Sequence, residues 1–297
     1  MRRFLVYSIS ILAAAIAMMA ANDLLNIALI EASPSSNPGK MRRLFANPEP
    51  DEIAILGSSR AQAGFVPGEI SPHAFNYGLN GSSFRETVFH LKEVLARPGA
   101  APVIVNLDHW GLNNGGFTGD YSLAWFSESV RSEPKISVPL ADRIPLLRFQ
   151  GGTRQNFSQY LNDRMAVTKT MERGAILERI SRSEAEWDYI ISKCDRTAFF
   201  SDDETTALLT DALCHRGNHP IVFVVSPISS PWLERFDGAE GLEALKAWLS
   251  AFEGVRVLDF SSSGEYPLSD FMDLTHLNET GARKFSRALA AGIGSGL

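Results

Sequence analysis

The sequence predicts an α/β fold with an N-terminal transmembrane helix: a doubly wound, mainly parallel sheet between two layers of helices. Short apolar runs alternate with amphipathic helical stretches along the chain, a pattern typical of parallel sheets. The 297 residues are 45% hydrophobic and 21% charged, enough to bury one full core. An uncharged apolar run fills residues 4–21.

The apolar run is long enough to cross a bilayer, and it follows Arg2 and Arg3. Basic residues ahead of a span favour a cytoplasmic N-terminus, so the rest of the chain is expected outside the cytoplasm, in the periplasm. A cleaved signal peptide is the alternative, because small residues around Ala20 offer a cleavage site. We favour an uncleaved, single-pass anchor in the cytoplasmic (inner) membrane.

The predicted organisation follows from composition. A linker rich in Pro, Ser and Asn separates the anchor from the folded part, and a glycine-rich, aromatic stretch with weak periodicity interrupts that part as an insertion. The predicted segments are the signal anchor at 1–31, the juxtamembrane linker at 32–50, and the catalytic domain at 51–297 with its insertion at about 111–200.

Each element has its own signal. The helix at 83–96 begins at Ser83 with Glu86 three positions on, the spacing of a capping box, and Asn278 caps the last helix. Buried strands are predicted from apolar runs that stop at turn residues. The predicted strands are 52–56, 74–77, 102–107, 220–225 and 255–260; the predicted helices are 83–96, 204–214, 241–252 and 279–291.

Two short motifs stand at opposite ends of this domain. Gly57-Ser58-Ser59 follows the first strand, and Asp273 lies three residues before His276, just ahead of the last helix. A serine nucleophile needs a base within hydrogen-bond reach and a group that orients the base, which these residues supply. Each motif alone is commonly a turn or a cap; their joint placement favours catalysis.

These motifs resemble the blocks of the SGNH, or GDSL-like, hydrolase superfamily. ILGSSRAQAGF resembles the first block, which makes Ser59 the nucleophile rather than Ser58, and FMDLTHLNETGARKFS resembles the last. FNYGLNGSS resembles the second block, whose glycine donates an N–H to the oxyanion; Gly81 matches best and Gly78 second. The resemblance covers 51–110 and 220–291 and implies a flavodoxin-like three-layer fold.

The third block departs from this pattern. It usually supplies an asparagine in Gly-x-Asn-Asp, whereas this chain reads NLDHWGLNN at that point. Asp108 and His109 are the nearest positions, and Asn113 is a further candidate that reaches back from the loop. The expected oxyanion donors are Ser59, Gly81 and Asn113. With this departure the chain resembles exported SGNH-like proteins that assist O-acylation of envelope polymers, such as those of alginate acetylation and teichoic acid D-alanylation.

Neighbouring polar and aromatic residues are candidates for substrate binding. Arg60 is placed to bind an anionic group, with a structural ion pair as the alternative. An aromatic group in the insertion is a candidate for sugar stacking, with core packing as the alternative. The substrate-binding candidates are Arg60, Asp108, His109 and Trp110; the aromatic group is Tyr121, Trp125 and Phe126.

No metal or cofactor is expected. Cys214, His215 and His219 suggest a metal site only superficially, because no second cluster completes it. Cys194 and Cys214 fit either a disulfide or two separate thiols. The net charge of −6 without a basic stripe argues against nucleic acid as a partner.

The resemblance implies a serine-dependent O-acyltransferase with an acyl-enzyme at Ser59, with acetyl as the expected group and a polysaccharide or other glycan as the acceptor. It also implies a polytopic membrane-bound O-acyltransferase as a partner that brings the acyl group across the bilayer. A carbohydrate acetylesterase and a non-catalytic scaffold of the same fold are the alternatives.

Overall fold

The computed structural model describes the chain except for residues 47–48, 150–152, 166–168, 262–263 and 295–297. The described residues group into two compact units. Unit 1 consists of Met1–Arg42 with Asp120–Ala166, and unit 2 of Arg43–Gly119 with Val167–Leu297. The segment boundaries predicted from the sequence remain predictions.

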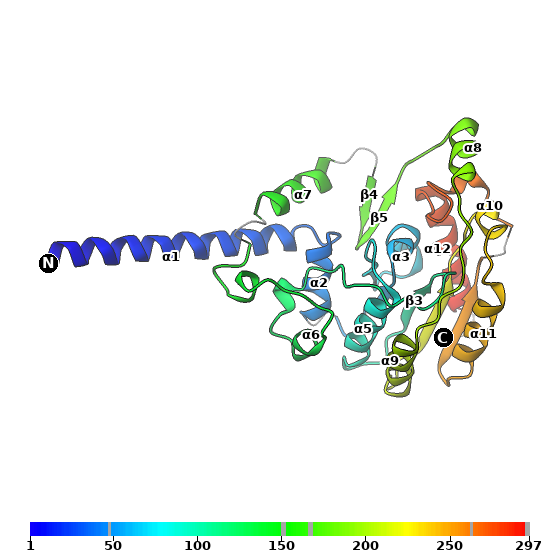
Figure 1. Cartoon of the computed structure of the whole chain (residues 1–297), viewed down its shortest axis with the longest axis horizontal. Coiled ribbons are helices and arrows are strands. Elements are labelled where there is room, and N and C mark those ends of the chain that lie inside the picture. The colour runs from blue at the N-terminus through cyan, green and yellow to red at the C-terminus, as the bar shows by residue number, and fades with distance from the viewer. Residues whose placement is uncertain (47–48, 150–152, 166–168, 262–263, 295–297) are drawn as a thin grey trace. The chain divides into compact units, whose positions relative to one another are not determined.

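Unit 2 is built on a five-stranded sheet in which every neighbouring pair of strands is parallel (Figure 1). The strand order is β2-β1-β3-β6-β7, and helices flank the sheet, so the predicted α/β class is confirmed. The strands are β1 (Ile53–Leu56), β2 (Ala74–Asn76), β3 (Val103–Leu107), β6 (Ile221–Val225) and β7 (Val255–Asp259).

One face of the sheet is covered by α3 (Ser59–Gly64) and α12 (Glu279–Gly294). Alternate strand residues such as Ile55 and Ile104 point into this core because side chains alternate across a strand. The two helices meet edge to face through Phe65 and Phe285, whose ring centroids are 5.0 Å apart, and each buried ring contributes about 1.5–3 kcal/mol. This packing holds the C-terminal end of α3 against α12.

A second group of helices completes the layers. α5 (Phe84–Leu95) contacts β1 and β3 and packs on α9 (Asp203–Cys214), while α11 (Ala239–Ser250) contacts β7. The predicted caps are found: Ser83 Oγ accepts from the Glu86 N–H, and Asn278 Oδ1 accepts from the Gly281 N–H. The Glu86 carboxylate also accepts from the N–H groups of nearby Thr118 and Gly119.

The structure contains a hairpin within the predicted insertion that the sequence does not predict. β4 (Lys169–Glu172) and β5 (Ala175–Glu178) pair antiparallel through a two-residue turn, Arg173-Gly174, in which both residues have positive φ. Glycine is favoured there because an L side chain resists that conformation. The remaining helices of unit 2 are α4 (Pro67–Ile70), α8 (Glu184–Ser192), α10 (Ser230–Leu233) and the 3₁₀ turn η3 (Leu268–Asp270).

Unit 1 holds the C-terminal part of α1 (Arg2–Glu31) against α7 (Thr153–Met165). Buried Asp23 pairs with Arg148 at 2.6 Å, and buried Asn26 donates to Thr153 Oγ1 at 2.9 Å. The other helical segments are η1 (Ser122–Ala124), α6 (Glu128–Ser132) and η2 (Ala141–Arg143), with α2 (Asn37–Phe45) crossing from unit 1 into unit 2.

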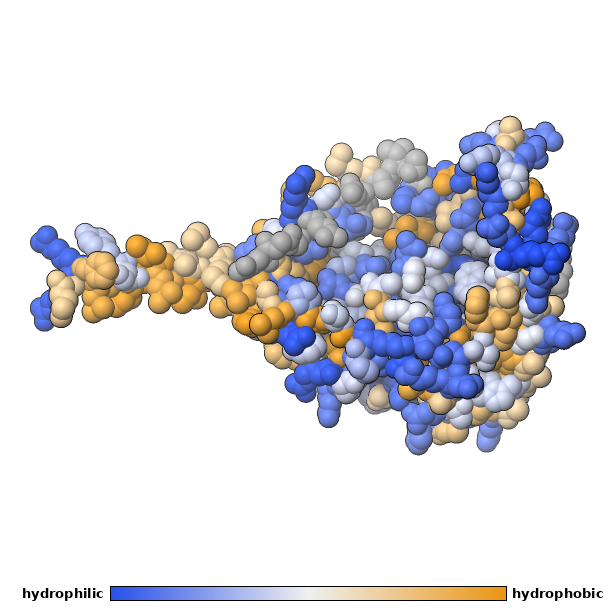
Figure 2. Space-filling model, in the orientation of Figure 1, coloured by the Kyte–Doolittle hydropathy of each residue, from blue (hydrophilic) through white to orange (hydrophobic). Residues whose placement is uncertain are grey.

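Within the described part of the chain, α1 is the one helix long and apolar enough to cross a membrane. Figure 2 shows hydrophobic residues covering much of its N-terminal length, with hydrophilic residues at its tip. A signal sequence has the same length and composition, so the finding establishes an apolar N-terminal helix that fits either use.

Candidate active site

The predicted nucleophile stands at the turn between β1 and α3. Gly57 has φ of +146°, and a Cβ at that position would lie 2.8 Å from the Cβ atoms of Ala61 and Asn106, so only glycine fits. Ser58 is the N-cap of α3, and its Oγ accepts from the Arg60 N–H at 3.3 Å. Ser59 is therefore the first residue of the helix, half-buried at the carboxyl edge of the sheet.

The predicted base and its predicted orienting carboxylate lie on one tight turn before α12. Asp273 Oδ1 accepts from the backbone N–H groups of Thr275 and His276, both at 2.8 Å. Asp273 Oδ2 lies 2.8 Å from His276 Nδ1. A carboxylate that binds its own backbone two and three residues on folds this segment locally, and the same bonds hold the imidazole beside it.

The two motifs meet in space. Ser59 Oγ lies 2.8 Å from His276 Nε2, although 217 positions separate the residues. Because the Asp273 carboxylate only accepts, His276 Nδ1 carries the ring proton, and Nε2 presents its lone pair to the serine hydroxyl. Ser59, His276 and Asp273 are thus connected in series, as the predicted nucleophile, base and orienting group require.

Electrostatics match this assignment. Burial raises the pKa of Asp273, but hydrogen bonds from His276 and Thr275 together with the charge of His276 outweigh it and lower the pKa to about 2. Asp273 is thus ionised at neutral pH and able to stabilise a positively charged imidazole. The Asp273 side chain keeps 42% of its surface exposed, so solvent screening moderates this stabilisation.

Arg60 is buried next to Ser59, and its guanidinium forms hydrogen bonds with other residues of the protein. Its side chain is 1% exposed, and Nε donates to the Thr275 carbonyl at 3.0 Å. The two remaining nitrogens bond to Asp108, His109 and two backbone carbonyls after β6. The expectation that Arg60 binds a substrate anion does not fit this geometry, whereas the structural alternative does.

Asp108 and His109 belong to the same buried group. Arg60 only donates, so His109 Nδ1 accepts its bond at 3.0 Å, and Asp108 Oδ1 accepts from Asn106 Nδ2 at 2.8 Å. Burial lowers the pKa of His109 well below its usual value, and the Arg60 charge lowers it further, so the ring is neutral. Trp110 is half-buried, with its ring 5.7 Å from the Arg60 guanidinium carbon. Trp110 is thus the most accessible of the predicted substrate-binding residues.

Two of the predicted oxyanion donors, Gly81 and Asn113, follow β2 and β3. The Leu79 N–H donates to the Gly57 carbonyl at 3.0 Å, which ties the loop carrying Gly81 to the nucleophile turn. Gly81 is exposed with φ of +76°, while the Gly78 N–H is already bonded to Asn76 Oδ1. Gly81 is therefore the better placed of the two glycines to donate to a ligand.

Other candidates from the sequence are dispersed. In unit 1, Tyr121 is buried, Trp125 is half-buried beneath Arg143, and Phe126 is 59% exposed. Cys194 and Cys214 are free thiols. A sugar-stacking role for the aromatic group remains a prediction.

A group with metal-ligand side chains lies away from the catalytic triad predicted at Ser59, Asp273 and His276. The ligand atoms of exposed Glu49, Asp51 and His73 are within 4.8 Å of one another, and Asp51 and His73 form an ion pair at 2.8 Å. This group contains none of the residues that superficially suggest a metal site in the sequence, Cys214, His215 and His219. The two ring nitrogens of His219 lie 2.9 and 3.2 Å from the carbonyl oxygens of Ala101 and Arg97. Such exposed ion pairs form without a metal, so we assign no cation to this group.

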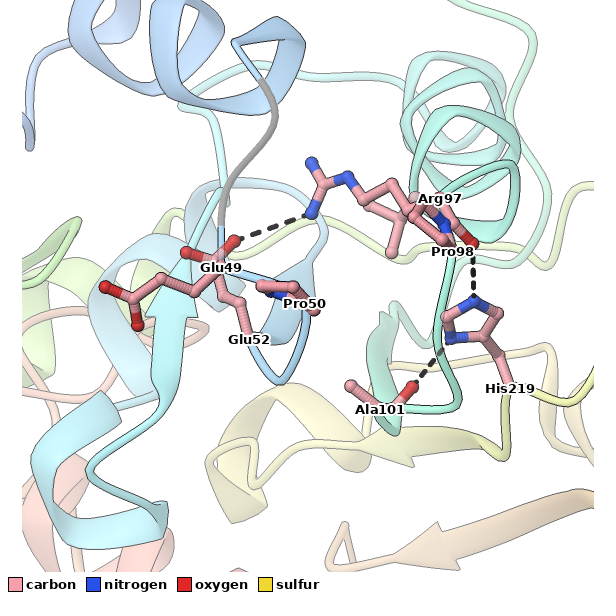
Figure 3. Close-up of a pocket in the computed structure, with 8 residues that line it drawn as sticks. Glu49, Pro50, Glu52, Arg97, Pro98, Ala101 and His219 are labelled. Carbon is pink, nitrogen blue, oxygen red and sulfur yellow. Dashed lines mark hydrogen bonds and ion pairs between the residues drawn. The ribbon is translucent and has the colours of Figure 1, made fainter.

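A cavity of about 470 Å³ lies at the opposite, amino-terminal edge of the sheet (Figure 3). Its lining comes from the segments just before β1, β3 and β6, together with the end of α5. Ligands of open parallel sheets bind at the carboxyl edge, where Ser59 and His276 are, and no triad residue lines this cavity. The lining residues are Glu49, Pro50, Glu52, Val94, Arg97, Pro98, Ala101 and His219.

We compared the chain with protein families, curated proteins and solved structures. No model of a protein family matches the chain, and no curated protein matches it. Among solved structures, a protein from Streptococcus pneumonia whose description names platelet activating factor is similar, with 11% sequence identity and a TM-score of 0.41. The match covers 92% of this chain and 98% of the other. At that TM-score the similarity carries no argument about function.

Proposed function

We propose that the chain is a serine-dependent acyl-ester enzyme of the SGNH type, with Ser59 as nucleophile, His276 as base and Asp273 as its orienting group. The observation that carries the proposal is the 2.8 Å contact between Ser59 Oγ and His276 Nε2, with Asp273 on the far side of the ring. A serine that is only a helix cap needs no imidazole at that position. Here the helix cap is the neighbouring Ser58.

The chemistry follows in two halves. Ser59 Oγ attacks the ester carbonyl carbon while His276 Nε2 takes the hydroxyl proton, and the alcohol then leaves with that proton, so that an acyl-Ser59 ester remains. An acceptor hydroxyl next gives its proton to Nε2 and attacks the acyl carbon. The bond from that carbon to Ser59 Oγ then breaks, and Nε2 returns the proton to Oγ, which restores the Ser59 hydroxyl and the neutral imidazole. Water as acceptor makes the protein an esterase, and a sugar hydroxyl makes it a transferase.

The proposed oxyanion donors are the N–H groups of Ser59 and Gly81 and the side-chain amide of Asn113. Ser59 opens α3, so its N–H is one of the amides that an α-helix leaves without an intrahelical partner. Donors fixed before the reaction stabilise the tetrahedral oxyanion most effectively.

We further propose O-acyl transfer, with acetyl as the group, to an envelope or exported glycan outside the cytoplasm, in company with a polytopic membrane O-acyltransferase. Two features support O-acyl transfer outside the cytoplasm: the resemblance of the sequence motifs to exported SGNH-like proteins, and the apolar helix α1. Mass spectrometry of the mature protein tests the anchor, because a chain beginning after about residue 21 contradicts a retained span.

A fluorophosphonate probe tests the central proposal. Wild-type protein should become covalently labelled at Ser59, and Ser59→Ala should abolish labelling. His276→Ala should slow it by about 10²–10⁴-fold, the usual contribution of a general base. Failure of correctly folded wild-type protein to label would instead indicate a scaffold of the same fold.

Product analysis then separates the two enzyme activities. A soluble acetyl ester is supplied with and without a saturating polysaccharide acceptor, and both free acetate and acetylated glycan are measured. The transferase assignment predicts acetylated glycan at the expense of acetate. Acetate release that the acceptor leaves unchanged would mean an esterase.

A further inference from the structure

Arg60 forms a hydrogen bond between the segment that carries Ser59 and the segment that carries His276, next to the contact between those two residues. It directly follows the nucleophile in the sequence, and its Nε donates to the carbonyl of Thr275, the residue directly before His276. The Ser59–His276 contact and the Arg60–Thr275 bond therefore join the same two segments one residue apart. Their lengths are 2.8 and 3.0 Å.

The other end of the guanidinium is anchored in the sheet. Nη2 donates to the carbonyls of Ser226 and Pro227, both at 3.0 Å, directly after β6. Nη1 contacts Asp108 and His109 directly after β3. One side chain thus bonds to the carboxyl ends of two central strands and to the loop carrying the base.

Arginine suits this position for a definite reason. Its planar guanidinium presents five N–H donors in a fixed geometry, whereas lysine presents three on one nitrogen and cannot satisfy acceptors on three separate segments. Buried carbonyls left without a donor are costly, so a lysine here must leave some of these acceptors unpaired or shift the loops. Ser229 gives a second link to the same loop, because its Oγ and N–H both bond to the Leu274 carbonyl.

We propose that Arg60 is a positioning residue, which keeps the Asp273–His276 turn in register with Ser59 through the Thr275 carbonyl. The proposal rests on the acyl-transfer function above. Arg60 itself is too deeply buried to touch a substrate, so its effect should fall on the chemical step rather than on binding. Displacements of about 1 Å in such sites cost roughly 10²-fold in rate.

Arg60→Lys in the full-length protein tests this proposal, using p-nitrophenyl acetate turnover and the rate of fluorophosphonate labelling. We expect kcat and the labelling rate to fall by roughly 10²-fold, with KM changed by less than about threefold. Arg97→Lys is the matched control, because Arg97 bonds to Glu52 and to the Leu44 carbonyl on the other edge of the same sheet. This control should label at the wild-type rate.

A milder variant covers the case in which Arg60→Lys does not fold. Ser229→Ala removes the hydroxyl bond to Leu274 but leaves the backbone bond in place, and it should slow labelling several-fold. A wild-type labelling rate in folded Arg60→Lys, or in Ser229→Ala where Arg60→Lys does not fold, would overturn the positioning role while the acyl-transfer proposal stands. Wild-type protein that does not label at all would defeat the acyl-transfer proposal instead.

Discussion

The side-chain oxygen of Asn113 accepts a hydrogen bond from the backbone N–H of Phe84, the first residue of α5. The Asn113 carbonyl accepts a second bond from the Arg85 N–H at 3.3 Å. These bonds fix the amide plane beside the loop that carries Gly81, and they leave the amide nitrogen as the group able to donate. A donor held in this way suits the oxyanion role proposed for Asn113.

Asn113→Asp separates the two roles of this side chain, which are to accept the Phe84 N–H bond and, as proposed, to donate to the oxyanion. The carboxylate keeps an oxygen for the Phe84 N–H and favours the helix N-terminus, so thermal stability should be unchanged or raised. Loss of the amide donor should slow fluorophosphonate labelling by roughly 10²–10³-fold. Asn113→Ala, which also removes the acceptor of the Phe84 N–H, should lose about 1 kcal/mol of stability in addition. Labelling of Asn113→Asp at the wild-type rate would limit Asn113 to holding the first residue of α5.

Ser58 and Ser59 are adjacent hydroxyls with different tasks, and alanine at each should reveal them. Ser58→Ala removes the N-cap acceptor of α3 and should cost about 0.5–2 kcal/mol in the free energy of unfolding, while labelling persists. Ser59→Ala should leave stability nearly unchanged and abolish labelling. Chemical denaturation and probe labelling of the two variants check this. A labelled Ser59→Ala protein would move the nucleophile to Ser58.

The low pKa of Asp273 predicts a specific acid sensitivity. Its folded-state pKa of about 2 lies below the ordinary value of 3.8, so its ionised form stabilises the fold above about pH 4. That contribution is lost as the pH falls from about 4 through 2. The melting temperature of wild type should therefore decline more steeply over this range than that of Asp273→Asn. Parallel curves for the two proteins would contradict the assignment.

The Asp23–Arg148 pair should control how the segment 120–149 attaches to α1. Both side chains are largely buried, with 9% and 13% exposed, and removing one partner of such a pair costs about 3–5 kcal/mol. Arg148→Met should therefore increase hydrogen exchange and proteolysis across this segment in detergent-solubilised protein. Exposed Arg131 provides the control, since Arg131→Met should protect the segment as well as wild type does.

The strands and the principal helices could be predicted from local patterns. Apolar runs at 52–56, 102–107 and 220–225 mark strands because a parallel sheet is buried on both faces. The β4–β5 hairpin was missed because its strands are short and partly exposed, although the Arg173-Gly174 turn gave a signal. A two-residue turn that ends in glycine is a weak signal for a hairpin when only a few flanking residues alternate between apolar and polar.

The sequence by itself determined the local chemistry: a glycine turn before Ser59, an Asp273–His276 turn closed by its own backbone bonds, and an apolar α1. These features depend on residues a few positions apart. Tertiary structure alone decided that Ser59 and His276 meet at 2.8 Å, and that Arg60 turns inward to the Thr275 carbonyl rather than outward to a substrate. Both outcomes depend on the order of strands in the sheet and on the packing of α3 against α12, which join residues about 215 positions apart.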